Sequence, residues 1–347
     1  FKSSRSQSIG SFTMYGGTIR DNELTTTAGN EGGGGVRVNE DSSFAMYGGT
    51  ICDNKIDARS YGGGGVYVMN GSFIMENGTI TGNESTQGGG GVEIRGGTIA
   101  VTNSTIRQNK CGDMGGGILI VTTTGTISNS TVSGNMAGER GGGLLLMSNN
   151  SFGLTNSTIT GNTASIDGGG LVIQDATVTI SGNLKINGNT KGGTIDSSGK
   201  LTGGDVNNVL LWNRRDHLHI GGKLTGGAGS IGVTTASTPG NNNYRDIAEG
   251  KSQYIDLSVF TYENDDTPIS TYTDTEGDVV FLRVCKHSFN NEWITGNGQH
   301  WHTCKNCDST SEKVNHTFNK RVSSSTYSAS AATCTEGPKY YYSCECG

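Results

Sequence analysis

A short string of residues recurs along the first half of this chain at a nearly constant interval, and this repeat constrains the fold most strongly. "STIRQNKCGDMGGGI" begins at Ser104, "STVSGNMAGERGGGL" at Ser130 and "STITGNTASIDGGGL" at Ser157. The glycine runs end at intervals of 30, 26, 26, 26 and 27 residues, at Gly35, Gly65, Gly91, Gly117, Gly143 and Gly170. A linker does not keep such a register, so each unit is interpreted as one structural repeat.

A second column consists of asparagines in a T-[IV]-x-x-N motif, at Asn22, Asn54, Asn83, Asn109, Asn135 and Asn162. From Asn83 onward, each stands eight residues before the last glycine of its run. We expect the series to continue at Asn183, which arrives five or six residues early, so the repeat changes its character after Gly170.

The residues around the glycine runs alternate between apolar and polar types. Examples are Val36-Arg37-Val38, Val66-Tyr67-Val68 and Val92-Glu93-Ile94, followed by Phe44 and Met46, Phe73 and Met75, and Phe152 and Leu154. A period of two indicates strands with one buried face. Consecutive glycines argue against a helical repeat, and a β-sandwich would not keep a register of about 26 residues. The pattern therefore predicts an all-β fold, a right-handed parallel β-helix with three short strands per coil.

Glycine suits positions where the chain turns with positive φ or where coils approach within about 4.8 Å. Asparagine tolerates the corner conformation, and its amide can bond to the same residue one coil away. The 58 glycines, three prolines and 7% aromatic residues suit a solenoid with a thin core. We expect about eight or nine coils from Ser11 to about Val233.

We expect three regions along the chain. Residues 1–234 form the β-helix, residues 235–284 form capping strands, and residues 285–347 form a small Cys/His-rich module. The string "GKLTGG" at Gly199–Gly204 and again at Gly222–Gly227 indicates that coiling continues. A cap is expected because the last coil would otherwise expose unpaired strand edges. The chain starts at Phe1 rather than Met, and we interpret it as a piece of a larger protein.

The outward position of the strand after each glycine run becomes apolar toward the C-terminus. It is occupied by Arg37, Tyr67, Glu93, Leu119, Leu145 and Val172. Three stacked apolar side chains would form a patch, so we expect the cap, the Cys/His module or a partner to cover Leu119, Leu145 and Val172.

Six of the eight cysteines lie between residues 285 and 346, together with four of the six histidines. Cys304-x-x-Cys307, preceded by His302, has the spacing of zinc ligands. The sequence predicts one structural zinc site from His287, His302, Cys304 and Cys307, with Cys285 and His300 as rivals for the fourth place, and a second from His316, Cys334, Cys344 and Cys346. Disulfides and free thiols are the alternatives. We interpret Cys52 and Cys111 as isolated thiols.

The sequence offers two weak candidates for a catalytic site. One is "NRRDHLHI", with Arg214, Arg215, Asp216, His217 and His219, and the other is the loop column of Asp113, Glu139, Arg140 and Asp167. We interpret both as surface charge rather than as an active site and predict a protein without enzymatic activity. The net charge of −6 argues against nucleic-acid binding, and no apolar run suits membrane insertion.

The G-G-G-[VIL] and [IV]-x-x-N columns are similar to the repeats of chlamydial polymorphic membrane proteins, although glycine stands here for alanine and regular phenylalanines are missing. The whole chain more closely resembles repetitive surface proteins of gut Firmicutes. "HSFNNEWITGNGQHWHTCKNC" and "HTF…AATCTEGPKYYYSCECG" resemble their Cys/His modules, but Cys344-Glu-Cys346 is one residue shorter than the usual C-x-x-C. The resemblance implies an extracellular adhesin or stalk that binds a host protein or glycan. A carbohydrate-active β-helix enzyme or a carbohydrate-binding module is the alternative.

Overall fold

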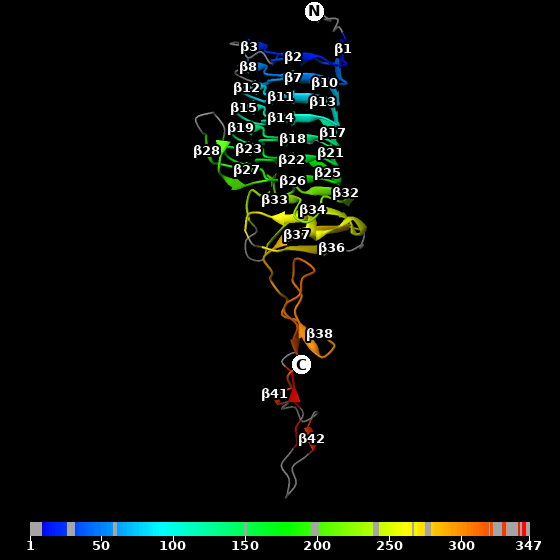
Figure 1. Ribbon diagram of the computed structural model, residues 1–347. Helices are drawn as coiled ribbons and strands as arrows, with labels where there is room; N and C mark the ends of the chain where they lie inside the picture. Colours follow the sequence, from blue (N-terminus) through cyan, green and yellow to red (C-terminus); the bar gives the residue numbers. More distant parts are fainter. Residues whose placement is uncertain are drawn as a thin grey trace, which may run out of the picture.

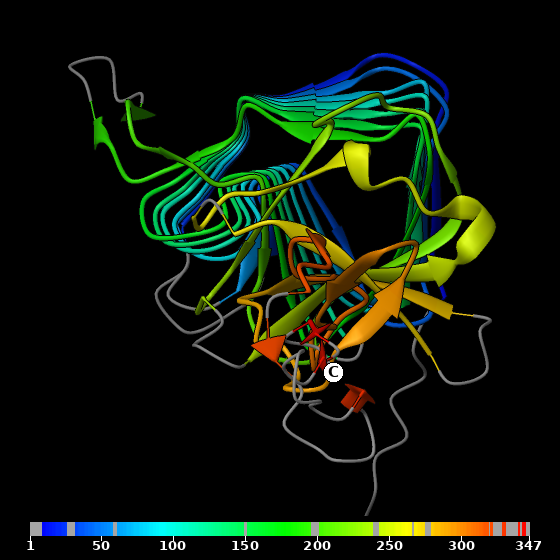
Figure 2. The same cartoon turned by 90° about the horizontal axis from the view of Figure 1, so that it is seen from below.

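The structure is a computed structural model that describes residues 9–25, 32–57, 61–148, 151–195, 201–238, 243–265, 267–274, 279–318, 320–321, 328–330, 339–340 and 342–344. The chain forms a rod of stacked β coils that continues into a narrow C-terminal module (Figure 1). Seen along the rod, the coils lie over one another (Figure 2). The predicted all-β parallel solenoid is therefore confirmed. No helix in the described part of the chain is long and apolar enough to cross a bilayer.

Three walls enclose the core of the rod. The first consists of β5 (Val36–Val38), β10 (Val66–Glu76), β13 (Val92–Thr102), β16 (Ile118–Val121), β20 (Leu144–Met147), β24 (Leu171–Gln174) and β31 (Val209–Leu211). The second includes β1 (Ser11–Met14), β6 (Ser43–Met46), the later parts of β10 and β13, β17 (Thr124–Ser128), β21 (Ser151–Thr155), β25 (Thr177–Gly182) and β32 (Leu218–Leu224). Parallel pairing joins equivalent residues of successive coils, such as Val66 and Val92.

The third wall contains the T-[IV]-x-x-N motifs. It consists of β2 (Thr18–Arg20), β7 (Thr50–Cys52), β11 (Thr79–Thr81), β14 (Thr105–Arg107), β18 (Thr131–Ser133), β22 (Thr158–Thr160), β26 (Lys185–Asn187) and β33 (Ile231–Thr235). A separate sheet of short strands runs beside it. This sheet consists of β3 (Glu23–Thr25), β8 (Lys55–Asp57), β12 (Glu84–Ser85), β15 (Lys110–Cys111), β19 (Met136–Ala137), β23 (Thr163–Ala164), β27 (Thr190–Lys191) and β30 (Asp205–Val206). The alternate apolar side chains of the walls fill the core; Phe73, Ile106 and Leu146 are buried.

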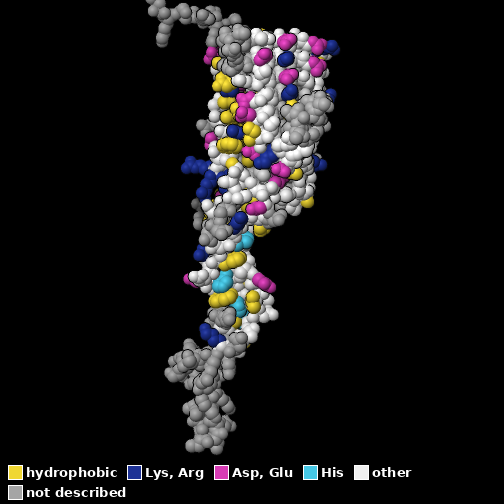
Figure 3. All heavy atoms as spheres, turned by 90° about the vertical axis from the view of Figure 1, so that its left-hand side faces the viewer, with side chains coloured by type: hydrophobic (Ala, Val, Ile, Leu, Met, Phe, Trp, Pro, Cys, Tyr) yellow, Lys and Arg dark blue, Asp and Glu magenta, His cyan; other side chains and the backbone are white. Residues whose placement is uncertain are grey.

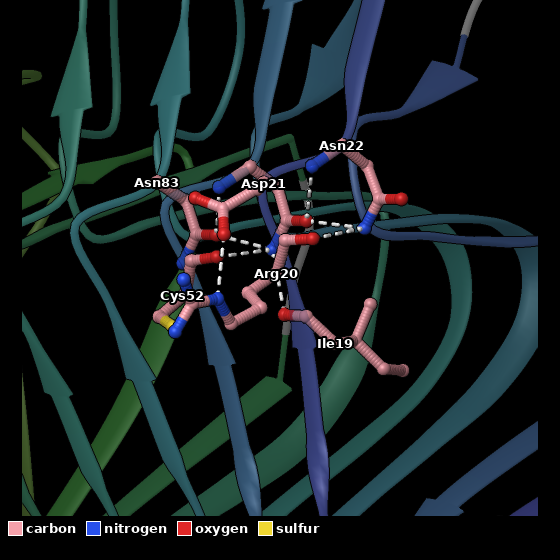
Figure 4. A network of polar contacts seen from close by, with 7 residues as sticks. Ile19, Arg20, Asp21, Asn22, Cys52 and Asn83 are labelled. Carbon is pink, nitrogen blue, oxygen red and sulfur yellow. Dashed lines mark hydrogen bonds and ion pairs between the residues drawn. The ribbon is translucent and has the colours of Figure 1, made fainter.

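The asparagine column forms a continuous hydrogen-bonded ladder inside the rod. The Nδ2 of Asn135 donates to the Oδ1 of Asn162 at 2.9 Å, and the backbone N–H of Asn135 donates to the same oxygen at 3.0 Å. Figure 4 shows the N-terminal end of the ladder, where Asn22 makes the same two contacts to the next coil. At the other end, the Glu263 carboxylate accepts from the side chain and backbone N–H of Asn208. A carboxylate ends the ladder because it accepts hydrogen bonds without donating any.

The ladder corrects the expected continuation at Asn183. The next member is Asn189, 27 residues after Asn162, and the one after it is Asn208. Asn183 is exposed and lies outside the ladder. Asn208 directly precedes β31 and stands in register with Gly170, because Val209 pairs with Leu171. An antiparallel excursion through β28 (Thr194–Ile195) and β29 (Leu201–Thr202) lies between Asn189 and Asn208 (Figure 1).

The outward apolar column is buried, but its cover differs from the expected one. Leu119, Leu145 and Val172 are 2%, 0% and 0% exposed and pack with Leu210. Met114, Val121, Met147 and Trp212 surround this second small core. The glycine-rich turns lie against the column: a Cβ on Gly168 would come within 2.0 Å of Val172 Cγ2. The repeats thus cover their own outward residues.

Coiling continues beyond the expected limit at about Val233. β34 (Tyr244–Lys251) still pairs in parallel with β32, and β35 (Phe260–Tyr262) with β33. β36 (Ile269–Thr273) and β37 (Val279–Cys285) then turn antiparallel and close the end of the core. Val280, Leu282 and Val284 of β37 are buried, so the cap covers apolar residues that the last coil would otherwise expose.

Candidate metal centre

The first ligand set begins at the last strand of the cap. Cys285 is the final residue of β37, where it pairs with Tyr244 of β34, and it is fully buried. His287 follows two residues later. Because β37 lies between β34 and β36, the rod itself fixes the position of the Cys285 thiol.

Cys304 and Cys307 lie on a turn that follows β39 (Gln299–Trp301), which pairs with β38 (Ile294–Gly296). The turn is closed by a hydrogen bond from the Cys304 backbone N–H to the Ser309 carbonyl at 2.9 Å. The backbone N–H of Asn306 points to the Cys304 sulfur at 3.5 Å. The Lys305 N–H donates to the Ser288 carbonyl at 2.9 Å, which holds this turn against the segment after Cys285.

The ligand atoms of Cys285, His287, Cys304 and Cys307 lie within 4.8 Å of one another. The sulfurs of Cys285 and Cys304 are 3.8 Å apart, and Cys307 Sγ lies 3.3 Å from His287 Nδ1. Tetrahedral zinc with Zn–S bonds of about 2.3 Å places two sulfurs about 3.8 Å apart. A disulfide between them would need about 2.05 Å. The donor set and its spacing therefore fit a closed Cys₃His zinc site.

The thiols of this cluster differ in acidity. Burial, together with the neighbouring Cys307 and Cys304 thiols, raises the pKa of Cys285 to about 12. Burial also opposes ionisation of Cys304, but hydrogen bonds from the Asn306 N–H and His287 bring the pKa of Cys304 down to about 6. A bound cation would favour the thiolate form of all three cysteines, because a coordinating thiol is deprotonated.

The structure brings together three of the four residues predicted for this site, with Cys285 in the place predicted for His302. The Nδ1 of His302 lies 3.0 Å from the Glu292 carbonyl, and the His302 ring lies against Trp293 with ring centroids 3.8 Å apart. These contacts hold the His302 ring within the module. His300 belongs to the second cluster.

The second cluster contains His300, His316 and Cys344. Cys344 Sγ lies 3.3 Å from His300 Nδ1, and both residues are buried. His316 and Cys344 were predicted here and His300 was not, whereas Cys334 and Cys346 fall outside the described residues. Histidine side chains lie among hydrophobic ones on the narrow module, as Figure 3 shows for one face. Three ligands within reach fit a second metal site.

Arg283 connects the first cluster to the rod. Its Nε donates to Asp246 at 2.7 Å, and its Nη1 donates to the Asn306 carbonyl on the Cys304–Cys307 turn. Its guanidinium lies between the rings of Tyr244 and Tyr272, 3.5 and 4.1 Å from their centroids. A planar cation held in this way links the turn firmly to β34 and β36.

The predicted loop column does gather at one edge of the rod. The Glu139 N–H donates to the Asp113 carbonyl. The backbone of Arg140 forms parallel β-bridges with Met114 and with Asp167. Arg140 lies 4.1 Å over the Trp212 ring, and Asp167 pairs with Lys191 at 2.6 Å. Burial first, and the neighbouring Glu139 second, raise the pKa of Asp113.

The stacked walls and in-register asparagine ladder define a β-solenoid. The family model of the right-handed β-helix region matches residues 2–152 and 34–209, so the matches together run from 2 to 209 of 347 residues. The chain belongs to this family. A search of curated proteins found no significant match, and neither did a search of solved structures.

Proposed function

We propose that the chain is a non-catalytic, extracellular adhesin or stalk that presents the walls of its β-helix to a host protein or glycan. The observation that carries this proposal is the regular hydroxyl surface of the third wall. Thr50, Thr79, Thr105, Thr131 and Thr158 stack in register, one per coil, with their side chains on the outer face. Such a wall offers donors and acceptors at intervals of about 4.8 Å.

The second wall has the same character. Thr98, Thr124, Ser151 and Thr177 occupy one outward row of it. Much of the rod surface in Figure 3 is neither charged nor hydrophobic. An extended polar ligand can contact many coils of such a surface, and the summed weak contacts of a multivalent site give avidity.

The Cys/His module has a structural role in this proposal. Ordering each backbone residue costs roughly 1–2 kcal/mol, and the module has few buried apolar side chains to offset that cost. Closed zinc sites contribute about 10 kcal/mol or more to the folding of small domains. The first centre shares Cys285 with the cap, so a bound zinc would cross-link the module to the rod.

Metal analysis of chain purified without added zinc tests the structural role. We expect about two zinc ions per chain, and we expect chelation to expose the region after Cys285 to protease while the β-helix resists. Absence of metal, with disulfides among the module cysteines found by mass spectrometry, would overturn this part of the proposal.

A glycan array combined with lyase and hydrolase assays tests the surface role. The proposal predicts binding without cleavage. The competing enzyme would use the paired acids of the loop column, Asp113 and Glu139, because polysaccharide hydrolysis needs two carboxylates. Turnover that is lost in Asp113→Asn and kept in the surface control Asp57→Asn would show an enzyme and refute the non-catalytic role.

A further inference from the structure

A second kind of metal-ligand set lies on the terminal coils of the rod, away from the cysteines. His219 is in β32, and His217 stands two residues earlier, so both side chains point to the same outer face. β34 is the neighbouring strand, and its register places Glu249 directly beside His219. Sequence positions 217 and 249 are thus brought together by the stacking of coils.

The turn before His217 is held from three directions. Asp216 is buried and accepts hydrogen bonds from the backbone N–H groups of Asn213, at 2.6 Å, and Asp175, at 3.0 Å. Arg245 of β34 donates to the Asn213 carbonyl at 2.7 Å. The neighbouring coil and strand therefore fix this turn, and a fixed backbone positions a ligand before any ion arrives.

The three side chains converge on one point. Glu249 Oε1 lies 2.6 Å from His219 Nδ1 and 3.3 Å from His217 Nε2. All three ligand atoms lie within 4.8 Å of one another, and each of the three side chains is partly exposed at the surface of the rod.

The His217 ring shows that the group is suited to a cation. Its Nδ1 lies 2.8 Å from the Arg215 carbonyl, which can only accept, so Nδ1 carries the hydrogen. In the neutral ring, Nε2 then carries a lone pair, and this lone pair faces a carboxylate oxygen of Glu249. The Nε2 atom of His217 is shielded from solvent and makes no hydrogen bond to any residue that the structure describes. A backbone carbonyl on the far nitrogen is also the arrangement that orients metal-binding histidines.

We propose that His217 Nε2, His219 Nδ1 and the Glu249 carboxylate bind one divalent transition-metal ion. Two imidazoles and a carboxylate are the donors of open zinc and iron sites, in which three protein ligands leave positions free. These positions take water or an oxygen ligand from outside, such as a hydroxyl or carboxylate group. This site differs from the Cys₃His centre, whose four protein ligands close it.

Cobalt titration of the full chain, loaded beforehand with only the two equivalents of zinc that the cysteine centres take, tests the proposal. Zinc occupies the cysteine centres first, and a site without sulfur gives weak visible cobalt absorption without the strong thiolate-to-metal charge-transfer band. We expect one further equivalent of Co²⁺ to bind with this weak spectrum. Glu249→Gln and His219→Gln should each weaken binding by about 100-fold or more.

Glu84→Gln is the matched control, because it removes an acid from the same rod that pairs with the exposed Lys110 at 3.4 Å. Its cobalt affinity should equal that of the unmodified chain. Circular dichroism identifies any variant that fails to fold, in which case the other of the two substitutions decides. The proposal is refuted if no further equivalent binds, if the charge-transfer band accompanies it, or if binding survives Glu249→Gln.

Discussion

Replacing Asn135 by alanine should destabilise the rod strongly, although its side chain is polar and adds no apolar group to the core. The side chain takes part in four hydrogen bonds: it accepts two from Asn109, and it donates one each to the Ile106 carbonyl and to Asn162. Asn135 is fully buried. Alanine leaves two donor hydrogens of Asn109 and the Ile106 carbonyl without these partners.

An unsatisfied buried polar group costs about 1–3 kcal/mol. Three such groups, with partial relaxation, give an expected loss of roughly 3–6 kcal/mol in the free energy of unfolding. The matched control is Asn187→Ala, which removes an exposed asparagine side chain from the same wall. The control should change the free energy of unfolding by less than about 0.5 kcal/mol.

Asn135→Asp separates the donor from the acceptor role. The carboxylate keeps the shape but faces the Ile106 carbonyl and the Asn162 oxygen, which are also acceptors. Burial should raise the pKa of the new carboxyl above the unfolded value of about 3.9. The folded state then binds the proton more tightly than the unfolded state, so stability falls as the pH rises above about 4.

Urea unfolding followed by circular dichroism, with hydrogen exchange to locate the loss, is the suitable assay. Repeat proteins can unfold in parts, so an unchanged urea dependence must be verified before free energies are compared. Exchange should accelerate first in the coils that contain Asn109, Asn135 and Asn162. Equal stability of Asn135→Ala and Asn187→Ala would refute the argument that the ladder stabilises the rod.

Three further outcomes follow from buried or tightly held groups. Burial raises the pKa of Glu93, so the free energy of unfolding should fall as the pH rises above about 4.5, and Glu93→Gln should lack that component in a pH series of urea unfolding curves. Gly168→Ala should lower the melting temperature more than Gly192→Ala. Both glycines have positive φ, but a Cβ on Gly168 would collide with Val172, whereas a Cβ on Gly192 would meet open space. Equal losses of melting temperature would contradict this prediction. Arg283→Lys should speed hydrogen exchange on the Cys304–Cys307 turn and leave the rod unchanged, because lysine lacks the planar fork; unchanged exchange on that turn would exclude this role.

The repeat was predictable because it depends on positions within one unit. The walls, the buried apolar residues and the asparagine ladder all follow from a period of two within a period of about 26. Asn189 was missed because Lys185 replaces the threonine of the motif and no glycine run ends eight residues after Asn189. Glu263, which ends the ladder, belongs to no motif, and only the stacking of β35 on β33 brings it to Asn208.

The metal centre shows where residue spacing stops being informative. Cys285 and His302 were both available at the right distance along the chain, and the sequence favoured the residue nearest the C-x-x-C turn. The choice depends on β37 lying in the cap beside that turn, and on the Glu292 carbonyl and Trp293 holding His302. Similarly, the pair His217 and His219 indicates a shared face, but the third ligand, Glu249, depends on strand register.

Because the asparagine ladder repeats the same bonds at every coil, the rod can be longer or shorter without any change in the bonding between neighbouring coils. Each coil contacts only its two neighbours, and equivalent atoms make the same bonds at every step, at 3.0 Å from Asn109 to Asn135 and 2.9 Å from Asn135 to Asn162. Removing residues 118–143 would bring Asn109 to Asn162 and join like to like at every wall. Each coil gained or lost would change the rod by about 4.8 Å and leave the bonding at the junction unchanged. The distance between the first coil and the Cys/His-rich module can therefore vary in whole steps of one coil.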